Sequence, residues 1–146
     1  LTPNAVDGSG ARQYLAKRYP DMRTLLIRAG PSWLDRRVPK RNADYELRAW
    51  LHGVSRPVDG IPLAAGCFLL CRGDVLRRVG GFDPVYFMYF EDFDMCLRLR
   101  AHGTIVFDPS VRITHLGGHT GRKSLRHIWW FLASAGQFFT KYQVRI

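Results

Sequence analysis

Residues 1–60 contain few long apolar runs and are interrupted by turn-forming residues. Residues 1–20 are polar and rich in Gly, Pro, Asn and Asp, which favours turns. Asp21 can cap a short helix, and apolar residues follow it until Gly30 and Pro31 end the pattern. Residues 35–48 are charged and weakly patterned, which is typical of a surface loop or a short helix.

The next segment is a nearly continuous apolar run over residues 63–71, which predicts a strand buried on both faces. Gly66 lies inside this run, and a glycine within a strand usually marks a bulge or a close approach to the backbone. Asp74 then predicts the start of a short helix that the glycine pair at residues 80–81 ends.

The last part of the chain predicts two helices around two short strands. An aromatic stretch leads into a helix expected over residues 91–100, with a buried stripe along it. Residues 104–107 and 111–115 predict strands separated by an Asp-Pro turn. Residues 124–142 predict an apolar, aromatic helix. This order of elements indicates part of an α/β domain.

The net charge of the chain indicates which kinds of partner it can bind. The 146 residues include 22 Lys and Arg against 12 Asp and Glu, a formal net charge of +10, which favours anionic partners. Residues 79–97 carry acidic but no basic side chains, whereas residues 111–146 carry basic but no acidic ones. A nucleic-acid binder has no need of such an acidic cluster and would pair a basic helix with base-stacking aromatics, so we expect no nucleic-acid partner.

Three cysteines, Cys67, Cys71 and Cys96, are too few for a disulfide framework. They indicate reduced core residues in a reducing compartment, and their spacing does not match a structural zinc site. The chain begins without Met and without the basic and apolar regions of a signal peptide, so we expect a fragment or a processed chain.

The candidate chemistry centres on Glu91 and Asp92, in the first turn of the predicted helix. Free N–H groups and the helix dipole favour ionised carboxylates there, and such a carboxylate beside a hydroxyl can act as a general base. The aromatic residues before them can desolvate the site and raise its basicity. The alternative is that both carboxylates only cap the helix. Asp94 projects from another side of a regular helix, so Asp92 and Asp94 cannot chelate one ion.

His115 and Gly66 each allow two interpretations. His115 ends an apolar strand face beside two glycines, either as a residue at the edge of the core or as a metal ligand. Gly66 either permits close helix packing or lets the phosphate or sugar of a ligand reach the backbone.

The stretch from Gly66 to Gly118 resembles the C-terminal half of a family 2 glycosyltransferase, through GCFLLCRGDVLRRVGGFDPVYFMYFEDFDMCLRLRAHG and IVFDPSVRITHLGG. It is most similar to the rhamnosyltransferase-like branch that builds bacterial cell-surface polysaccharide. Upstream, the DGS at residues 7–9 and the Arg-Tyr-Pro at residues 18–20 fit the same family more weakly.

The resemblance implies an α/β fold: a partial GT-A (Rossmann-like) domain with a mixed sheet, flanking helices and a C-terminal amphipathic helix. Residues 1–60 would be an irregular connecting region after a missing nucleotide-binding half, because they contain neither its Asp-x-Asp nor its βαβ pattern. Residues 61–120 would be the acceptor-side catalytic portion and residues 121–146 the amphipathic helix. Half a sheet exposes an unpaired edge, so self-association or pairing with the missing half is expected. Whether this part is active alone stays open.

The site residues follow from the same resemblance. It makes Asp92 the catalytic base, with Glu91 beside it. Gly66 falls near the donor sugar and its diphosphate, and Asp94 and Arg98 are further candidates for donor or acceptor contacts.

His115 would complete a site for a divalent metal, Mg or Mn, most of whose ligands are expected from the missing half. The implied reaction is inverting transfer of a single sugar, such as the deoxyhexose rhamnose, from a nucleotide-sugar to a lipid-linked or polysaccharide acceptor. The QxxRW signature of processive relatives is absent, since residues 97–100 read Leu-Arg-Leu-Arg, which favours single transfer.

The apolar segment at residues 128–139 is too short to span a bilayer, which takes about 20 residues. Basic residues flank it, so it either lies in the interface of an anionic membrane or packs on the core of its own domain. We therefore expect a cytoplasmic protein with peripheral contact to the inner face of the cytoplasmic membrane. The alternative function is a non-catalytic membrane-associated or assembly module that retains part of the glycosyltransferase fold.

Overall fold

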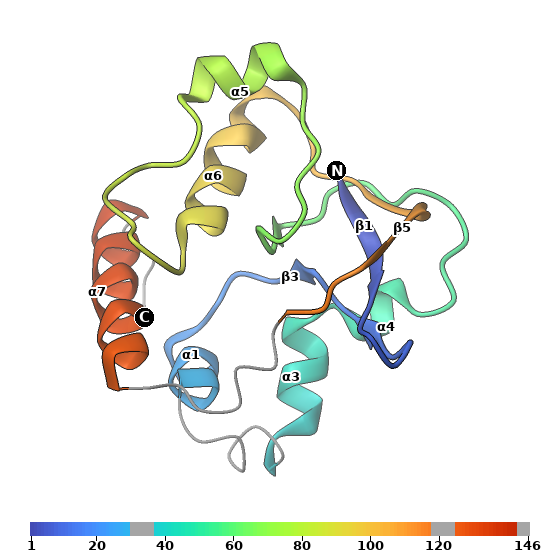
Figure 1. Ribbon diagram of the computed structural model, residues 1–146, viewed down its shortest axis with the longest axis horizontal. Helices are drawn as coiled ribbons and strands as arrows, with labels where there is room; N and C mark the ends of the chain where they lie inside the picture. The colour runs from blue at the N-terminus through green and yellow to red at the C-terminus, as the bar shows by residue number, and fades with distance from the viewer. Residues whose placement is uncertain (30–36, 118–124, 143–146) are drawn as a thin grey trace.

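The computed structural model describes residues 1–29, 37–117 and 125–142. They form a mixed α/β structure in which helices surround a small three-stranded sheet and a separate two-stranded sheet (Figure 1).

The three-stranded sheet joins the beginning of the chain to its last strand. Its central strand, β1 (Thr2–Val6), runs parallel to β5 (Phe107–Thr114) on one side and antiparallel to β2 (Arg12–Gln13) on the other. The second sheet pairs β3 (Ala16–Lys17) with β4 (Leu63–Ala64) in antiparallel fashion. Residues 1–60 and 61–120 therefore share both sheets, and the division of the chain at residues 60 and 120 stays a prediction.

The helices are mostly short, and the longest lies at the end of the described chain. They are α1 (Met22–Ala29), α3 (Pro39–Tyr45), α4 (Arg48–Leu51), α5 (Gly73–Val79), α6 (Glu91–Leu99), the 3₁₀ turn η1 (Arg100–His102) and α7 (Leu125–Tyr142). In Figure 1, α6 lies beside α7 and below α5.

Two hydrophobic clusters form the core, and α6 lies between them. The first gathers residues of both sheets, α4 and α6, including Leu51, Ile61, Leu63, Cys96 and Phe107. The second joins α1, the loop before α6, and α7 through Leu25, Tyr86, Phe90, Ala135 and Phe138. Phe93 and Leu97 of α6 pack against both clusters, so burial of apolar surface on two sides holds this helix in place.

The helix signals at Asp21 and Gly80 are confirmed, whereas Asp74 lies within the first turn of α5 and does not cap it. Asp21 accepts hydrogen bonds from the backbone N–H of Thr24 (2.7 Å) and from its hydroxyl (3.0 Å) at the start of α1. Gly80 ends α5 in the left-handed conformation (φ 77°), which glycine adopts without steric cost. The charged segment before residue 48 forms a short helix, α3.

The predicted strand over residues 63–71 is wrong beyond Ala64. The N–H of Ala65 still bonds to the carbonyl of Leu15 beside β3, but the N–H of Gly66 is donated to the Asp92 carboxylate, and the pairing with β3 ends there. Cys67, expected in the core, is exposed for the same reason.

The first predicted strand, over residues 104–107, is wrong except at Phe107, where a single strand, β5, begins and runs through Asp108 and Pro109 to Thr114. The expected turn is a shift in register opposite Pro3 and Asn4 of β1, and the strand continues through it. Strand β1 itself lies where turns were expected.

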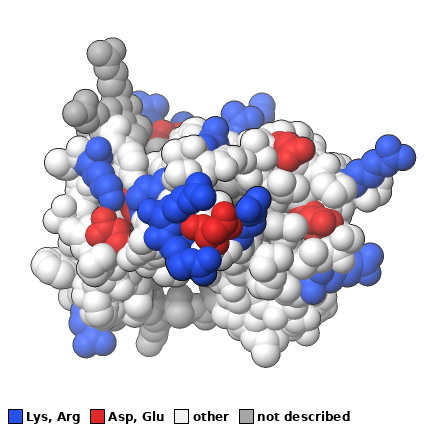
Figure 2. All heavy atoms as spheres, turned by 90° about the horizontal axis from the view of Figure 1, so that it is seen from above, with Lys and Arg blue, Asp and Glu red and all other residues white. Residues whose placement is uncertain are grey.

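Acidic and basic side chains alternate on the surface. Figure 2 looks onto the end of the molecule that carries α5, where Lys and Arg side chains surround a smaller group of Asp and Glu side chains. Near α5, for example, Arg72 pairs with Asp74 at 3.1 Å. The net positive charge is thus interleaved with acidic groups on this face.

Candidate active site

The chain enters α6 through a sharp backbone turn. Tyr89 and Phe90 both have positive φ (70° and 65°), a conformation that costs a residue other than Gly about 1–2 kcal/mol. Aromatic contacts hold the turn, since the Phe90 ring packs against Phe93, Phe131 and Phe138 at centroid distances of 5.8, 5.4 and 5.2 Å. This turn places Glu91 and Asp92 in the first turn of the helix.

Asp92 is held by two backbone hydrogen bonds. Its Oδ1 accepts the N–H of Phe93 (2.8 Å), and its Oδ2 accepts the N–H of Gly66 (2.9 Å). Burial raises the pKa of Asp92 to about 6; the nearby charge of Glu91 adds to this rise, and the hydrogen bond from Gly66 opposes it. Asp92 has no ion-pair partner among the residues that the structure describes. It is therefore a carboxylate of unusual basicity with lone pairs left to accept a proton.

Asp92 and Glu91 line a cavity of about 230 Å³. Its remaining walls come from α1, α3, the loop before α6, α6 itself and α7, through Leu25, Tyr45, Tyr89, Phe90, Phe93 and Phe131. Within the described chain, the Oε2 atom of Glu91 is buried and accepts no hydrogen bond. A mostly aromatic pocket with two carboxylates can hold a sugar ring by its apolar face and accept hydrogen bonds from its hydroxyls.

Gly66 approaches Asp92 closely. A Cβ built on Gly66 would lie 3.0 Å from the Cβ of Asp92, closer than side chains normally pack. The structure therefore brings Gly66, Glu91 and Asp92 together, with Gly66 supporting the carboxylate through its N–H. The assignment of Gly66 to donor or acceptor binding stays a prediction.

Replacing Gly66 with Ala should lower turnover by about tenfold to a hundredfold, because the new methyl group displaces the Asp92 carboxylate by a few tenths of an ångström or more. The measurement is kcat together with the thermal unfolding midpoint. Gly73→Ala is the matched control, since a Cβ there meets only the Arg77 guanidinium at an ordinary 3.6 Å. Equal activities of the two variants would contradict the supporting role of Gly66.

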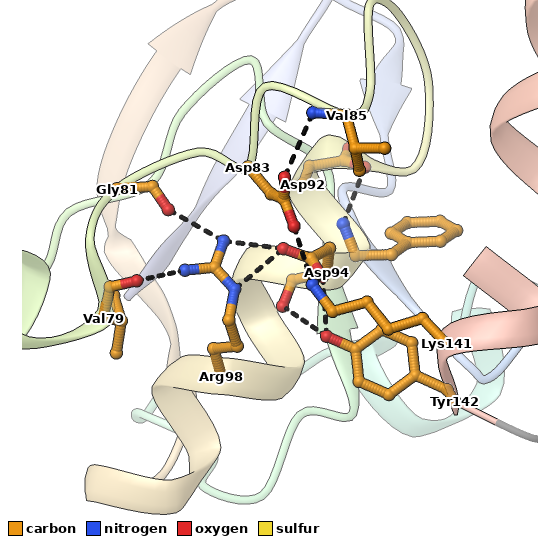
Figure 3. Close-up of polar contacts among 10 residues, drawn as sticks. Val79, Gly81, Asp83, Val85, Asp92, Asp94, Arg98, Lys141 and Tyr142 are labelled. Carbon is orange, nitrogen blue, oxygen red and sulfur yellow. Dashed lines mark hydrogen bonds and ion pairs between the residues drawn. The ribbon is translucent and has the colours of Figure 1, made fainter. Parts of the chain in front are cut away.

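Asp94 points away from this cavity into a network of hydrogen bonds and ion pairs (Figure 3). Its fully buried carboxylate accepts from Arg98 Nε (2.8 Å), Lys141 Nζ (2.7 Å) and Tyr142 Oη (2.7 Å). Burial alone would raise the pKa of Asp94, but the hydrogen bonds from Lys141, Tyr142 and Arg98 outweigh it and hold the pKa below its usual value.

Arg98 and Lys141 extend the network to the loop after α5. Arg98 donates to the carbonyls of Val79 and Gly81, and Lys141 also pairs with Asp83 at 2.8 Å. The network thus connects α6 to α7 and to the end of α5 at Val79 and Gly81. Neither Asp94 nor Arg98 is among the residues that line the cavity, and their donor- or acceptor-binding role stays a prediction.

His115 follows β5, where the carboxyl ends of two parallel strands meet. Its N–H is donated to the carbonyl of Val6, and its Nδ1 lies 2.7 Å from the Oε1 of Gln13, whose amide donates to the His115 carbonyl (3.3 Å). A Gln13 oxygen that faces Nδ1 favours the tautomer with the proton on Nδ1, in which Nε2 is the nitrogen that can bind a metal.

The described residues do not form a metal site by themselves. Within residues 1–29, 37–117 and 125–142, no group of three or more His, Cys, Asp and Glu side chains could hold a metal ion. His115 supplies one nitrogen of suitable chemistry, so its metal role stays a prediction.

Sequence reasoning missed several walls of the cavity. Tyr89 and Phe90 were among the aromatics expected to desolvate the carboxylates, but Leu25, Tyr45 and Phe131 come from elements far away in the chain. Gln13, which orients His115, had no signal in the sequence.

No helix of the described segments has the length and apolar character needed to cross a membrane.

Comparisons with known proteins give partial matches to sugar-transferring enzymes. No family model and no solved structure matches the chain. It is 38% identical over 120 residues to the N-acetylglucosaminyl-diphospho-decaprenol L-rhamnosyltransferase of Mycobacterium tuberculosis, an alignment that covers 75% of this chain and 37% of the relative. It is 35% identical over 82 residues to the rhamnosyltransferase WbbL of Escherichia coli, covering 55% of this chain and 31% of the relative. The chain thus spans about a third of the length of these curated relatives, and its similarity is to rhamnosyltransferases.

Proposed function

We propose that this chain is the acceptor-side part of a GT-A, family 2 glycosyltransferase that transfers a single sugar with inversion. The donor is a nucleotide-sugar, with a deoxyhexose such as rhamnose as the sugar, and the acceptor is a lipid-linked or polysaccharide component of the cell envelope. The observation that carries the proposal is Asp92, a basic carboxylate held by two backbone N–H groups at an aromatic cavity. The similarity to rhamnosyltransferases supports the choice of sugar.

Asp92 acts as the general base. The hydroxyl of the acceptor gives its proton to an Asp92 oxygen while the hydroxyl oxygen forms a bond to the anomeric carbon of the donor. The bond from that carbon to the nucleotide diphosphate breaks on the opposite face, and the diphosphate leaves with the electron pair, which inverts the configuration. The N–H groups of Gly66 and Phe93 keep the carboxylate oriented during the step, and Glu91 Oε2 accepts a second hydroxyl.

A divalent metal, Mg or Mn, would offset the charge of the leaving diphosphate. The described residues do not make such a site by themselves, so no step here is derived through the metal. His115 would contribute Nε2 to it. The enzyme works in the cytoplasm at the inner face of the membrane. It self-associates or pairs with the nucleotide-binding half, which covers the open edge of its sheet.

The test is a transfer assay of the chain joined to the nucleotide-binding half, with a panel of nucleotide-sugars and a polyprenyl-diphosphate-linked acceptor. We expect a single sugar to be added, preferentially from a nucleotide-deoxyhexose, with an anomeric configuration opposite to that of the donor. Retention of configuration would contradict Asp92 as base. Absence of transfer from every donor would favour the alternative function, a non-catalytic membrane-associated or assembly module.

The rate should follow the titration of Asp92. Because the pKa of Asp92 is raised to about 6, the base form is lost as the pH falls through that value. We expect kcat/KM to be level above about pH 7 and to fall about tenfold per pH unit well below pH 6. A pH–rate profile with its acid limb near pH 4, the ordinary range of an aspartate, would contradict a buried base.

A further inference from the structure

Helix α7 has one side packed in the core and an apolar side in solvent. Ser134, Ala135 and Phe138 are buried. On the opposite side, Leu125, Trp129 and Leu132 are 86%, 67% and 51% exposed. Their spacing of four and three residues places them along one face of the helix, and we call them the apolar stripe.

The loop before α6 adds to this surface. Phe87 is 73% exposed, and its ring lies 4.9 Å from that of Trp130, the neighbour of Trp129 in α7. Single exposed apolar residues are ordinary on a protein surface, but large apolar side chains aligned along a helix mark an interaction surface.

The charges beside the apolar stripe suit an anionic partner. The Arg126 guanidinium lies 4.8 Å from the centre of the Trp130 ring, in the first turn of α7. The chain has no acidic residue from Val111 to Ile146. Asp83 and Asp94 pair with Lys141 at the other end of α7, and Glu91 and Asp92 line the cavity that Phe131 of α7 also lines. A tryptophan-bearing apolar face next to a cation is the combination that lies in the interface of an anionic bilayer.

We propose that the apolar stripe and Arg126 bind the surface of an anionic membrane. Phe131 of the same helix lines the cavity of Asp92, so docking through α7 would bring the cavity to the level of the lipid head groups. Only this last step rests on the proposed function, because it assumes a lipid-linked acceptor. Membrane binding itself requires no sugar transfer.

The experiment is cosedimentation of the full chain with vesicles of phosphatidylcholine, with and without phosphatidylglycerol. We expect binding to vesicles that contain phosphatidylglycerol, reduced at least about tenfold in the double variant Trp129→Ser, Leu132→Ser. Arg126→Gln should weaken binding to the anionic vesicles about fivefold and leave the weak binding to neutral vesicles unchanged.

Trp50→Ser is the matched control, because Trp50 is also exposed (46%) but lies on α4. This variant should bind as the unsubstituted chain does, and circular dichroism should show equal thermal unfolding for all variants. Equal binding of the double variant and the control would overturn the proposal. It would also be overturned if sedimentation without lipid showed a dimer that the double variant abolishes, since a second copy would then cover the stripe. Because no outcome depends on activity, failure here contradicts the location at the membrane but leaves the proposed sugar transfer untouched.

Discussion

Replacing Asp92 with Asn is expected to lower kcat by about a hundredfold to ten-thousandfold, the range that a positioned general base contributes. The amide has almost the shape of the carboxylate, and its oxygen can still accept one of the two N–H groups that hold Asp92. It cannot take a proton from the acceptor hydroxyl. Substrate affinity should change little, so the loss should appear in kcat rather than in KM.

The folded state offers a second readout of the same variant. The pKa of Asp92 is raised by burial, so the fold binds its proton more tightly than the unfolded chain does. The stabilising contribution of this group is therefore complete below about pH 4 and is lost as the pH rises through about 6. In Asp92→Asn this pH dependence should disappear from urea unfolding measured across that window.

Asp108→Asn is the matched control for activity, because Asp108 accepts hydrogen bonds from Ser110 within β5 and is not among the residues that line the cavity. It should retain the full rate. A fully active Asp92→Asn variant would remove the basis of the proposed mechanism.

Replacing Asp94 with Asn should destabilise the fold by about 3 kcal/mol. The buried carboxylate balances the charges of Arg98 and Lys141 and accepts the hydroxyl of Tyr142. A neutral amide removes the ion-pair partner of Arg98 and leaves Lys141 paired with Asp83 alone. Urea unfolding at neutral pH measures the loss.

The matched control is Asp74→Asn, which breaks the exposed ion pair with Arg72 and should destabilise the fold far less than Asp94→Asn does. The pKa of Asp94 is held below its ordinary value near 4. Its ionised carboxylate therefore stabilises the fold fully at pH values above that ordinary value, and this stabilisation is lost as the pH falls through the lowered pKa. The difference between Asp94→Asn and the unsubstituted chain should therefore shrink in acid. Equal losses for the two variants at neutral pH would show that the network carries no stability.

Local signals explain which elements the sequence could predict. Helix α5 ends at the left-handed Gly80, α6 carries acidic residues in its first turn, and the apolar spacing of α7 is continuous, so neighbouring residues give a signal for each helix. Strand β1 has no such pattern. It forms because β5 supplies hydrogen bonds from the other end of the chain, and that pairing also turns the Asp-Pro pair into a bulge.

The residues of the candidate site also differ in whether local sequence patterns could predict them. Glu91 and Asp92 could be found because a helix start and an acidic pair are visible within a few residues. The hydrogen bond from Gly66 to Asp92 spans 26 residues, and no pattern in the sequence reports it. The spacing of Asp94 and Arg98 by four residues predicts contact on a helix, but their burial depends on Lys141 and Tyr142 of α7.

The pairing of β1 with β5 has a consequence during synthesis on the ribosome. Gln13 and His115, which meet beside this pair of strands, are 102 residues apart. Because synthesis adds about 5–20 residues per second, β1 remains unpaired on this edge for several seconds before β5 emerges. Such distant pairing slows folding and leaves an unpaired strand exposed, so newly made chains should depend on chaperones more than the completed fold does.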